Sequence, residues 1–245
     1  MQADGHHYAG RGRKGRICVE IKADDADLLR SMQAVIPWRT TISYRTRVPN
    51  FSASASSVVL NLCALEGRMR LLELGLPVGR KSATIAPPVV PFSRRDYLRG
   101  LFDADGSVGF TAKGVPFLSL VTASPAISEF VCAEIHNVTG AVRTARPNKR
   151  DGVMNVMVGY EAATQLATWL YSDAGIALER KRSAGLAVAA WRRPSTMRAA
   201  STRRRWTVDE DAVVLRLPIR EAALQLGRTE QSVNLRRWRL RSQAS

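Results

Sequence analysis

The chain of 245 residues has few of the residues that hold disulfide-rich or zinc-stabilised domains together, with three cysteines and three histidines. Cys18, Cys63 and Cys132 stand singly within apolar segments. This pattern favours buried thiols in a reducing compartment over a disulfide framework or a zinc site. No apolar run approaches the roughly 20 residues that cross a membrane, and the N-terminal segment lacks the apolar stretch of a secretory signal. We therefore expect a cytoplasmic protein without a membrane partner.

Acidic residues are also scarce, with 21 Asp and Glu against 37 Lys and Arg, which gives a formal net charge of +16. Hydrophobic residues make up 45% of the chain, enough to bury a core, and this excludes a disordered basic tail. An excess of positive charge on a folded protein favours a polyanionic partner. We expect that partner to be nucleic acid rather than a small-molecule substrate.

The positive charge is concentrated at the C-terminus. Residues 192–245 contain thirteen Arg, no Lys and five acidic residues, a net charge of +8. The small and basic residues of 192–202 are typical of a linker, which leaves 203–245 as a separate module. A proline-rich stretch, 77–92, divides the remainder into two parts, 1–88 and 89–191.

These two parts have similar patterns. Residues 16–82 and 115–183 each predict a strand, a helix, two strands and a helix, and each ends in a Gly-Leu or Gly-Ile turn and a basic cluster around Lys81 or Lys181. We interpret this as an internal duplication of an α+β unit. Chance similarity between two ordinary α+β stretches is the alternative.

The segment 93–110, SRRDYLRGLFDADGSVGF, carries the most informative pattern. Ser93 is a suitable N-cap, and the apolar spacing predicts a helix over 94–105 that ends at Gly106. A glycine inside a helix, here Gly100, usually marks a close approach by another element. Asp103 and Asp105 at the C-terminus of a helix oppose its dipole, which a metal ion would offset. Ordinary solvated aspartates or a calcium-type loop would give the same pattern.

The stretch LRGLFDADG (98–106) resembles the signature of the LAGLIDADG homing endonucleases at seven of nine positions. The resemblance implies duplicated αββαββα half-domains whose sheets form a saddle on DNA, and signature helices that pack side by side. Gly100 and Leu101 would then form the helix contact. Asp105 would be a catalytic metal ligand, with the adjoining Ala104 in the same site, and Lys181 and Lys81 would be the catalytic basic residues.

The N-terminal residues Met1–Gly5 (MQADG) match the last five positions of the same signature, with Gln2 in place of the first aspartate. Asp4 therefore takes the second metal-ligand position, with Ala3 beside it. The alternative is an acidic residue in a frayed terminus. The helix that should carry this motif would precede Met1, so we expect a monomeric pseudo-dimer if the first half is complete, and self-association through helix 94–105 otherwise. His6 and His7 are expected to face solvent or DNA.

Residues 203–242 predict three short helices, with Thr207 and Glu210 as a capping box, Gly227 ending the second helix and Thr229 capping the third. The order of Trp, acidic and basic residues resembles a Myb/SANT-like helix-turn-helix. A helical protein-interaction module is the alternative. On the third helix, the residues expected to contact DNA are Gln231, Asn234, Arg236, Arg237 and Arg239.

Together these patterns predict a Mg²⁺-dependent endonuclease that cuts double-stranded DNA across the minor groove, with an appended DNA-binding module. In the nuclease part, the residues expected to contact DNA are Arg11, Arg13, Lys14, Arg45, Arg47, Lys113, Arg143, Arg146 and Lys149. A catalytically silent DNA-binding regulator is the main alternative, because the first motif is damaged. An intron maturase that binds RNA is the third.

Overall fold

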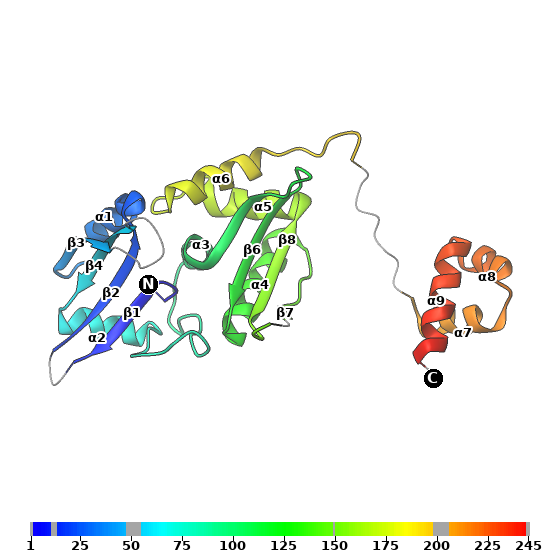
Figure 1. The fold of residues 1–245 in the computed structure, drawn as a ribbon, viewed down its shortest axis with the longest axis horizontal. Coiled ribbons are helices and arrows are strands. Elements are labelled where there is room, and N and C mark those ends of the chain that lie inside the picture. Colours follow the sequence, from blue (N-terminus) through cyan, green and yellow to red (C-terminus); the bar gives the residue numbers. More distant parts are fainter. Residues whose placement is uncertain (1, 11–13, 48–54, 149, 198–205, 244–245) are drawn as a thin grey trace. The chain divides into compact units, whose positions relative to one another are not determined.

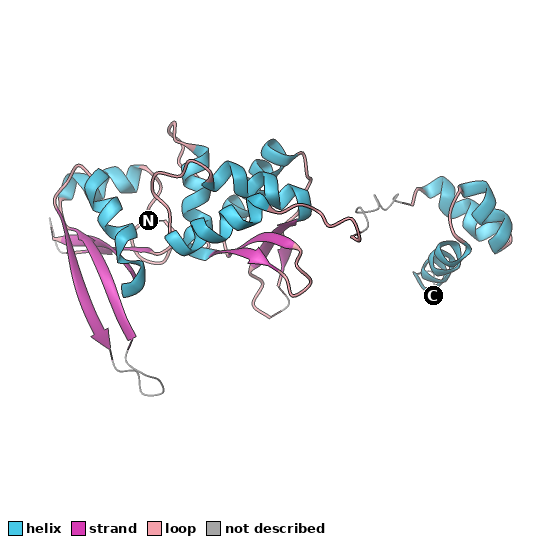
Figure 2. Cartoon of the chain, turned by 90° about the horizontal axis from the view of Figure 1, so that it is seen from above, coloured by secondary structure: helices cyan, strands magenta, loops and turns pink. Residues whose placement is uncertain are grey.

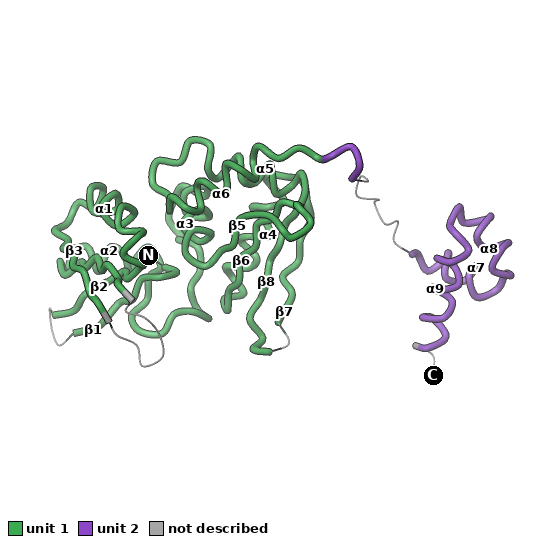
Figure 3. The backbone as a smooth tube through the Cα atoms, turned by 45° about the horizontal axis from the view of Figure 1, so that its top comes forward, with its two compact units in different colours: residues 1–193 green, residues 194–245 purple. Residues whose placement is uncertain are grey.

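The computed structural model describes residues 2–10, 14–47, 55–148, 150–197 and 206–243, and the side chains of 47, 55 and 243 are not described. The chain divides into two compact units, residues 1–193 and 194–245, coloured separately in Figure 3. In the described part of both units, no helix has the length and apolar character needed to cross a membrane.

The first half of unit 1, which we define as residues 2–88, contains one antiparallel sheet and two α-helices (Figure 1). The strands are β1 (Gly5–Ala9), β2 (Gly15–Lys22), β3 (Thr40–Arg47) and β4 (Ala55–Leu62), in the order β1-β2-β4-β3. The helices are α1 (Ala26–Val35), preceded by a short 3-10 turn (Ala23–Asp25), and α2 (Leu65–Glu73).

The second half, residues 89–193, opens with helix α3 and contains a second antiparallel sheet of the same strand order, β5-β6-β8-β7. The strands are β5 (Gly106–Phe110), β6 (Pro116–Thr122), β7 (Arg146–Pro147) and β8 (Met154–Gly159). The helices are α3 (Arg94–Asp105), α4 (Pro125–Thr139), α5 (Tyr160–Tyr171) and α6 (Glu179–Ala190).

The register of the strands relates the two sheets position by position. Gly5 pairs with Val19 in the first sheet, and Gly106 pairs with Leu120 in the second. Alternate residues of each central strand are fully buried, including Ile17 and Val19 in β2 and Leu118 and Leu120 in β6. This period of two places one face of each sheet against helices, and Figure 2 shows the helices of each half on one side of its sheet.

Two segments differ from the sequence-based expectation. In the described residues between α4 and β8, the first of the two predicted strands is the two-residue strand β7, whereas the equivalent β3 has eight residues. The sequence pattern predicts one final helix in the second half, whereas the structure has two, α5 and α6. The apolar residues of α6 show little helical periodicity, so the pattern does not mark it as a separate helix. Cys63 is exposed rather than buried.

Unit 2 contains three helices, α7 (Val208–Arg216), α8 (Ile219–Leu226) and α9 (Glu230–Gln243). The predicted capping box at Thr207 and Glu210 is present, and Gly227 ends α8 in the left-handed conformation. The buried core consists of Val214, Ala222, Ala223 and Val233. Leu215 is 49% exposed, and its neighbour Val214 is buried.

Candidate active site at the end of helix α3

Helix α3 begins and ends where the sequence predicted. The Ser93 hydroxyl accepts a hydrogen bond from the Asp96 amide at 3.2 Å, which satisfies one of the free N–H groups of the first turn. Leu98, Leu101 and Phe102 are buried in the core of the second half. This buried face fixes the helix so that its C-terminus delivers two carboxylates before the chain turns into β5.

The two carboxylates have different environments. Asp103 is buried and accepts hydrogen bonds from the Tyr171 hydroxyl at 3.0 Å and from the Leu178 amide at 2.9 Å. Burial raises the pKa of Asp103, and these two hydrogen bonds oppose the rise. Asp103 thus ties the end of α3 to the segment that leads into α6, and Asp105 remains on the exposed side.

Lys181, in the first turn of α6, completes this end of the second half. Its side chain is buried, and its ammonium group donates hydrogen bonds to the carbonyl oxygens of Phe102 and Gly106. Burial lowers the pKa of Lys181, as does Arg180, and the charges of Asp103, Asp105 and Asp4 raise it. The lysine therefore holds a positive charge between the end of α3 and the start of β5.

The first half builds an equivalent arrangement from different hydrogen bonds. Lys81 is buried, and its ammonium group donates to the carbonyl oxygens of Gln2 and Ala3. Gln2 occupies the position of Asp103, but its amide donates to the carbonyl oxygens of Leu74 at 3.2 Å and Gly75 at 2.7 Å. The glutamine thus fixes the N-terminal segment by donating hydrogen bonds, whereas Asp103 fixes the end of α3 by accepting them.

Contacts between the two halves bring the N-terminal segment of the first half close to the C-terminal end of α3. The amide of Gln2 also donates to the Ala86 carbonyl oxygen at 3.1 Å, and its carbonyl oxygen accepts from the Tyr97 hydroxyl of α3. Arg180 in α6 forms an ion pair at 3.3 Å with Asp25, which precedes α1. These contacts place Asp4 at the start of β1 beside the end of α3.

Asp4, Asp105, Lys81 and Lys181 form one electrostatic centre. Burial raises the pKa of Asp105 although part of the side chain is exposed; the negative charge of Asp4 raises it further, and the two lysines oppose this. Burial lowers the pKa of Lys81, and Asp105 and Asp4 oppose that shift. Asp105, Lys81 and Lys181 therefore lie close enough to Asp4 for its charge to shift their pKa values, although the four residues come from separate segments of the sequence.

The donors at this centre fit a divalent metal ion. Carboxylate and carbonyl oxygens are the ligands that Mg²⁺ prefers, and Asp4 and Asp105 repel each other unless a cation lies near both. Among the residues that the structure describes, no group of three or more His, Cys, Asp or Glu side chains could hold a metal. A cation here would therefore depend on the two carboxylates, on the Ala104 backbone oxygen and on substrate, because the Ala3 oxygen accepts a hydrogen bond from the Lys81 ammonium group.

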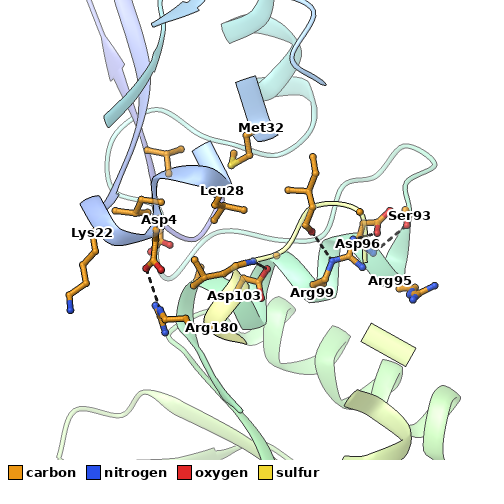
Figure 4. A pocket seen from close by; sticks show the side chains of 18 of the residues that line it. Asp4, Lys22, Leu28, Met32, Ser93, Arg95, Asp96, Arg99, Asp103 and Arg180 are labelled. Carbon is orange, nitrogen blue, oxygen red and sulfur yellow. Dashed lines mark hydrogen bonds and ion pairs between the residues drawn. The ribbon is translucent and has the colours of Figure 1, made fainter. Parts of the chain in front are cut away.

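The helix contact expected at Gly100 is not formed by any described element. Gly100 is exposed, and an added Cβ would meet no atom within 4 Å, whereas Leu101 is buried in its own half. A cavity of about 890 Å³ lies beside Gly100. Figure 4 shows Arg99, Asp103 and Arg180 on one side of this cavity and Leu28 and Met32 on the other.

The predicted DNA-contacting residues of unit 1 lie on strands and turns. Lys14, Lys113 and Arg146 are exposed, Arg143 is half-buried, and Arg45 lies 3.6 Å from Glu20. The predictions at Arg11, Arg13 and Lys149, and at the side chain of Arg47, lie outside the described residues.

In unit 2 the predicted residues divide into two groups. Gln231, Asn234 and Arg239 are exposed on α9. Arg236 is ion-paired with Asp211 at 2.6 Å, and Arg237 donates to the carbonyl oxygens of Val214, at 2.8 Å, and Leu217. The last two therefore hold α9 against α7, a role that differs from the predicted contact with DNA.

Sequence analysis missed several residues that shape the centre. Tyr171 and the Leu178 amide carry no local signal, because they reach Asp103 from 68 and 75 residues away. His7, expected to face solvent or DNA, is buried, and its Nδ1 lies 3.5 Å from the Leu76 carbonyl oxygen. The alternation of β1 could have indicated the burial of His7, because Gly5 and His7 lie on the same, buried face of the strand.

Comparisons with known proteins find similarity only among solved structures. No protein-family profile and no curated protein sequence matches the chain. The homing endonuclease I-WcaI bound to its DNA recognition sequence is 12% identical, with a TM-score of 0.48 over 75% of this chain and 81% of that one. The LAGLIDADG homing endonuclease I-LtrWI bound to target DNA is 8% identical, with a TM-score of 0.43 over 77% and 86%.

Full-length DUF199/WhiA from Thermatoga maritima is 10% identical, with a TM-score of 0.42 over 97% of this chain and 86% of that one. At such identities and TM-scores, the similarity assigns no function to the chain, and the chemistry of the centre rests on its own residues.

Proposed function

We propose that the chain is a metal-dependent endonuclease that hydrolyses phosphodiester bonds in both strands of double-stranded DNA. The observation that carries this proposal is the convergence of Asp4 and Asp105, each beside a buried lysine, at one exposed centre between the two halves. Paired carboxylates with adjacent positive charge are suited to phosphoryl chemistry, in which charge develops on the attacking and leaving oxygens.

In this proposal Asp4 and Asp105 would hold Mg²⁺, with the carbonyl oxygen of Ala104 near the same centre. When bound, the metal supplies Lewis-acid stabilisation of the phosphate and lowers the pKa of water. The carboxylates would position the metal relative to the two halves. Because one carboxylate comes from each half, each half would provide the carboxylate for cleavage of one strand of the duplex.

Lys81 and Lys181 have a positioning and electrostatic role. Each ammonium group is held by backbone carbonyl oxygens of its own half, so its charge is fixed before substrate arrives. Such preorganised charge stabilises a phosphorane-like transition state without reorganisation at the moment of reaction.

Unit 2 contributes DNA affinity through the exposed side of α9, which presents Gln231, Asn234 and Arg239. A helix in the major groove places such side chains on base edges and phosphates. The exposed faces of the two sheets in unit 1 would provide the other contacts.

The test is cleavage of a plasmid library that carries randomised inserts, with Mg²⁺, followed by sequencing of the product ends. We expect cuts at one preferred site, and we expect Asp105→Asn to reduce cleavage by about a hundredfold or more while duplex affinity stays within about twofold. Asp24→Asn is the matched control, because it makes the same exchange at an exposed carboxylate outside the centre. Equal cleavage by Asp105→Asn and the unaltered chain would exclude Asp105 from the chemistry.

A second candidate is a DNA-binding protein without nuclease activity. Gln2 favours this non-cutting function, because the first half has an amide where the second half has the Asp103 carboxylate. The same library distinguishes the two, since selective duplex binding with no cut at any Mg²⁺ concentration would establish the silent binder.

A further inference from the structure

The second sheet has an exposed face whose centre carries no charge. Directly paired residues of an antiparallel sheet point to the same face. One row of this face is Val121, Asn155 and Arg146, and the next is Ser107, Ser119 and Met157. Val121 is 45% exposed and Met157 48%, and all described helices of this half pack on the opposite face. We call Val121, Asn155, Met157, Ser107 and Ser119 the neutral platform.

One position of the neutral platform has a charged equivalent in the first sheet, and a neighbouring position, Phe117, has another. Because Gly5–Val19 corresponds to Gly106–Leu120, Val121 corresponds to Glu20 and Phe117 to Arg16. Glu20 accepts a hydrogen bond from Ser57 at 2.6 Å and lies 3.6 Å from Arg45. The two sheets therefore present different chemistry at matching places.

Positive charge is found at the edges of the neutral platform. Lys113 is exposed in the turn between β5 and β6, and Arg146 is exposed on the edge strand β7. In the described part of this face the strands carry no acidic residue. Cations at the edges and an uncharged centre are complementary to a DNA groove, in which phosphates flank the base edges.

We propose that the neutral platform reads thymine methyl groups, through Val121 and Met157, and adenine through Asn155, so that the half-site bound by the second half is rich in A·T pairs. This inference deepens the proposed function and rests on it. Apolar side chains recognise the thymine methyl in the major groove, and an asparagine amide pairs with adenine N6 and N7. Val121 and Asn155 are direct cross-strand partners, so they address adjacent base pairs.

The test uses the full chain and a randomised duplex library, bound in buffer containing EDTA so that the DNA stays intact. Each thymidine of the selected site is then replaced singly by deoxyuridine, which removes only the methyl group. We expect two or more uracil-sensitive positions, all on one side of the cleavage point. Each should weaken binding about fourfold, the effect of exposing one buried methyl group.

Variants connect the effect to the platform. Val121→Ser and Met157→Ser should each abolish the thymine-to-uracil difference at one or two positions, and Met157→Leu should retain it. Val89→Ser is the matched control, because Val89 is 95% exposed and lies outside the sheet. The readout is an affinity ratio within one variant, so a partly unfolded preparation does not alter it.

The outcomes separate this inference from the proposed function. A selected and cleavable site with no uracil-sensitive position would overturn the reading of thymine and leave the nuclease intact. Failure to select any duplex would refute DNA recognition itself. If Val121→Ser or Met157→Ser instead dissociates an oligomer without changing the uracil ratio, the platform is a protein interface and the inference is overturned.

Discussion

Gly100 offers a direct test of whether helix α3 packs against another surface in solution. It lies in the interior of a twelve-residue helix, is exposed, and has no atom within 4 Å of an added Cβ. Glycine in a helix interior is about 1 kcal/mol less favourable than alanine. Gly100→Ala should therefore stabilise unit 1 by about that amount, which corresponds to a rise in Tm of about 2–4 °C for a domain of this size.

Gly185 is the matched control. It also lies inside a twelve-residue helix, α6, but an added Cβ would lie 2.3 Å from the Tyr171 ring. The overpacking cost of about 1–3 kcal/mol exceeds the gain in helix propensity. Gly185→Ala should therefore lower Tm, and displacement of Tyr171 should also disturb the Asp103 carboxylate that its hydroxyl contacts.

The assay is thermal unfolding of the full chain without metal or DNA, combined with sedimentation velocity. A fall in Tm for Gly100→Ala would refute the reasoning, because it would show that another surface packs against Gly100. If that fall coincides with loss of a dimer, the second surface belongs to another copy of the chain.

Two further predictions concern ionisation and unit 2. The pKa of Asp103 is raised by burial, so its contribution to stability is fully present below its unfolded pKa and is lost as pH rises through the folded pKa. The Tm of Asp103→Asn relative to the unaltered chain should therefore increase as pH rises above the ordinary pKa of an aspartate. A difference that stays constant with pH would contradict this. Arg236→Ala should lower the melting temperature of unit 2, because it breaks the pair with Asp211. Arg239→Ala should leave that temperature unchanged and reduce the slope of log affinity against log salt by about 0.9; the opposite assignment of the two effects would place Arg236 on the DNA.

Local signals in the sequence predicted the parts of the fold that depend on neighbouring residues. The caps at Ser93 and Thr207 depend on backbone groups three residues away, so they were predicted correctly. The bounds of α3 followed from the same signals. The central strands β2 and β6 also followed, because their alternation reports which face is buried, whereas the four-stranded sheets were implied by the resemblance.

Features that depend on distant partners were not predictable. Arg99 is buried because its guanidinium donates to the carbonyl oxygens of Leu170 and Ile176, each at 3.0 Å, which no local pattern indicates. Arg236 and Arg237 are a different case. They share a helical face with the buried Val233, so the spacing along α9 indicates a place against the core that their charge alone does not.

The opposite hydrogen-bond polarity of Gln2 and Asp103 limits how the two halves can be interchanged. Asp103 is surrounded by donors, and Gln2 directs its amide group at three carbonyl oxygens. A carboxylate at position 2 would face lone pairs from Leu74, Gly75 and Ala86, and its charge would be disfavoured there. Restoring the complete signature in the first half therefore requires rebuilding the loop after α2 together with residue 2. An engineer who transplants the second half's aspartate together with its loop and Tyr171 would preserve the pairing, whereas exchanging the aspartate or the loop alone would leave a polar group without a partner.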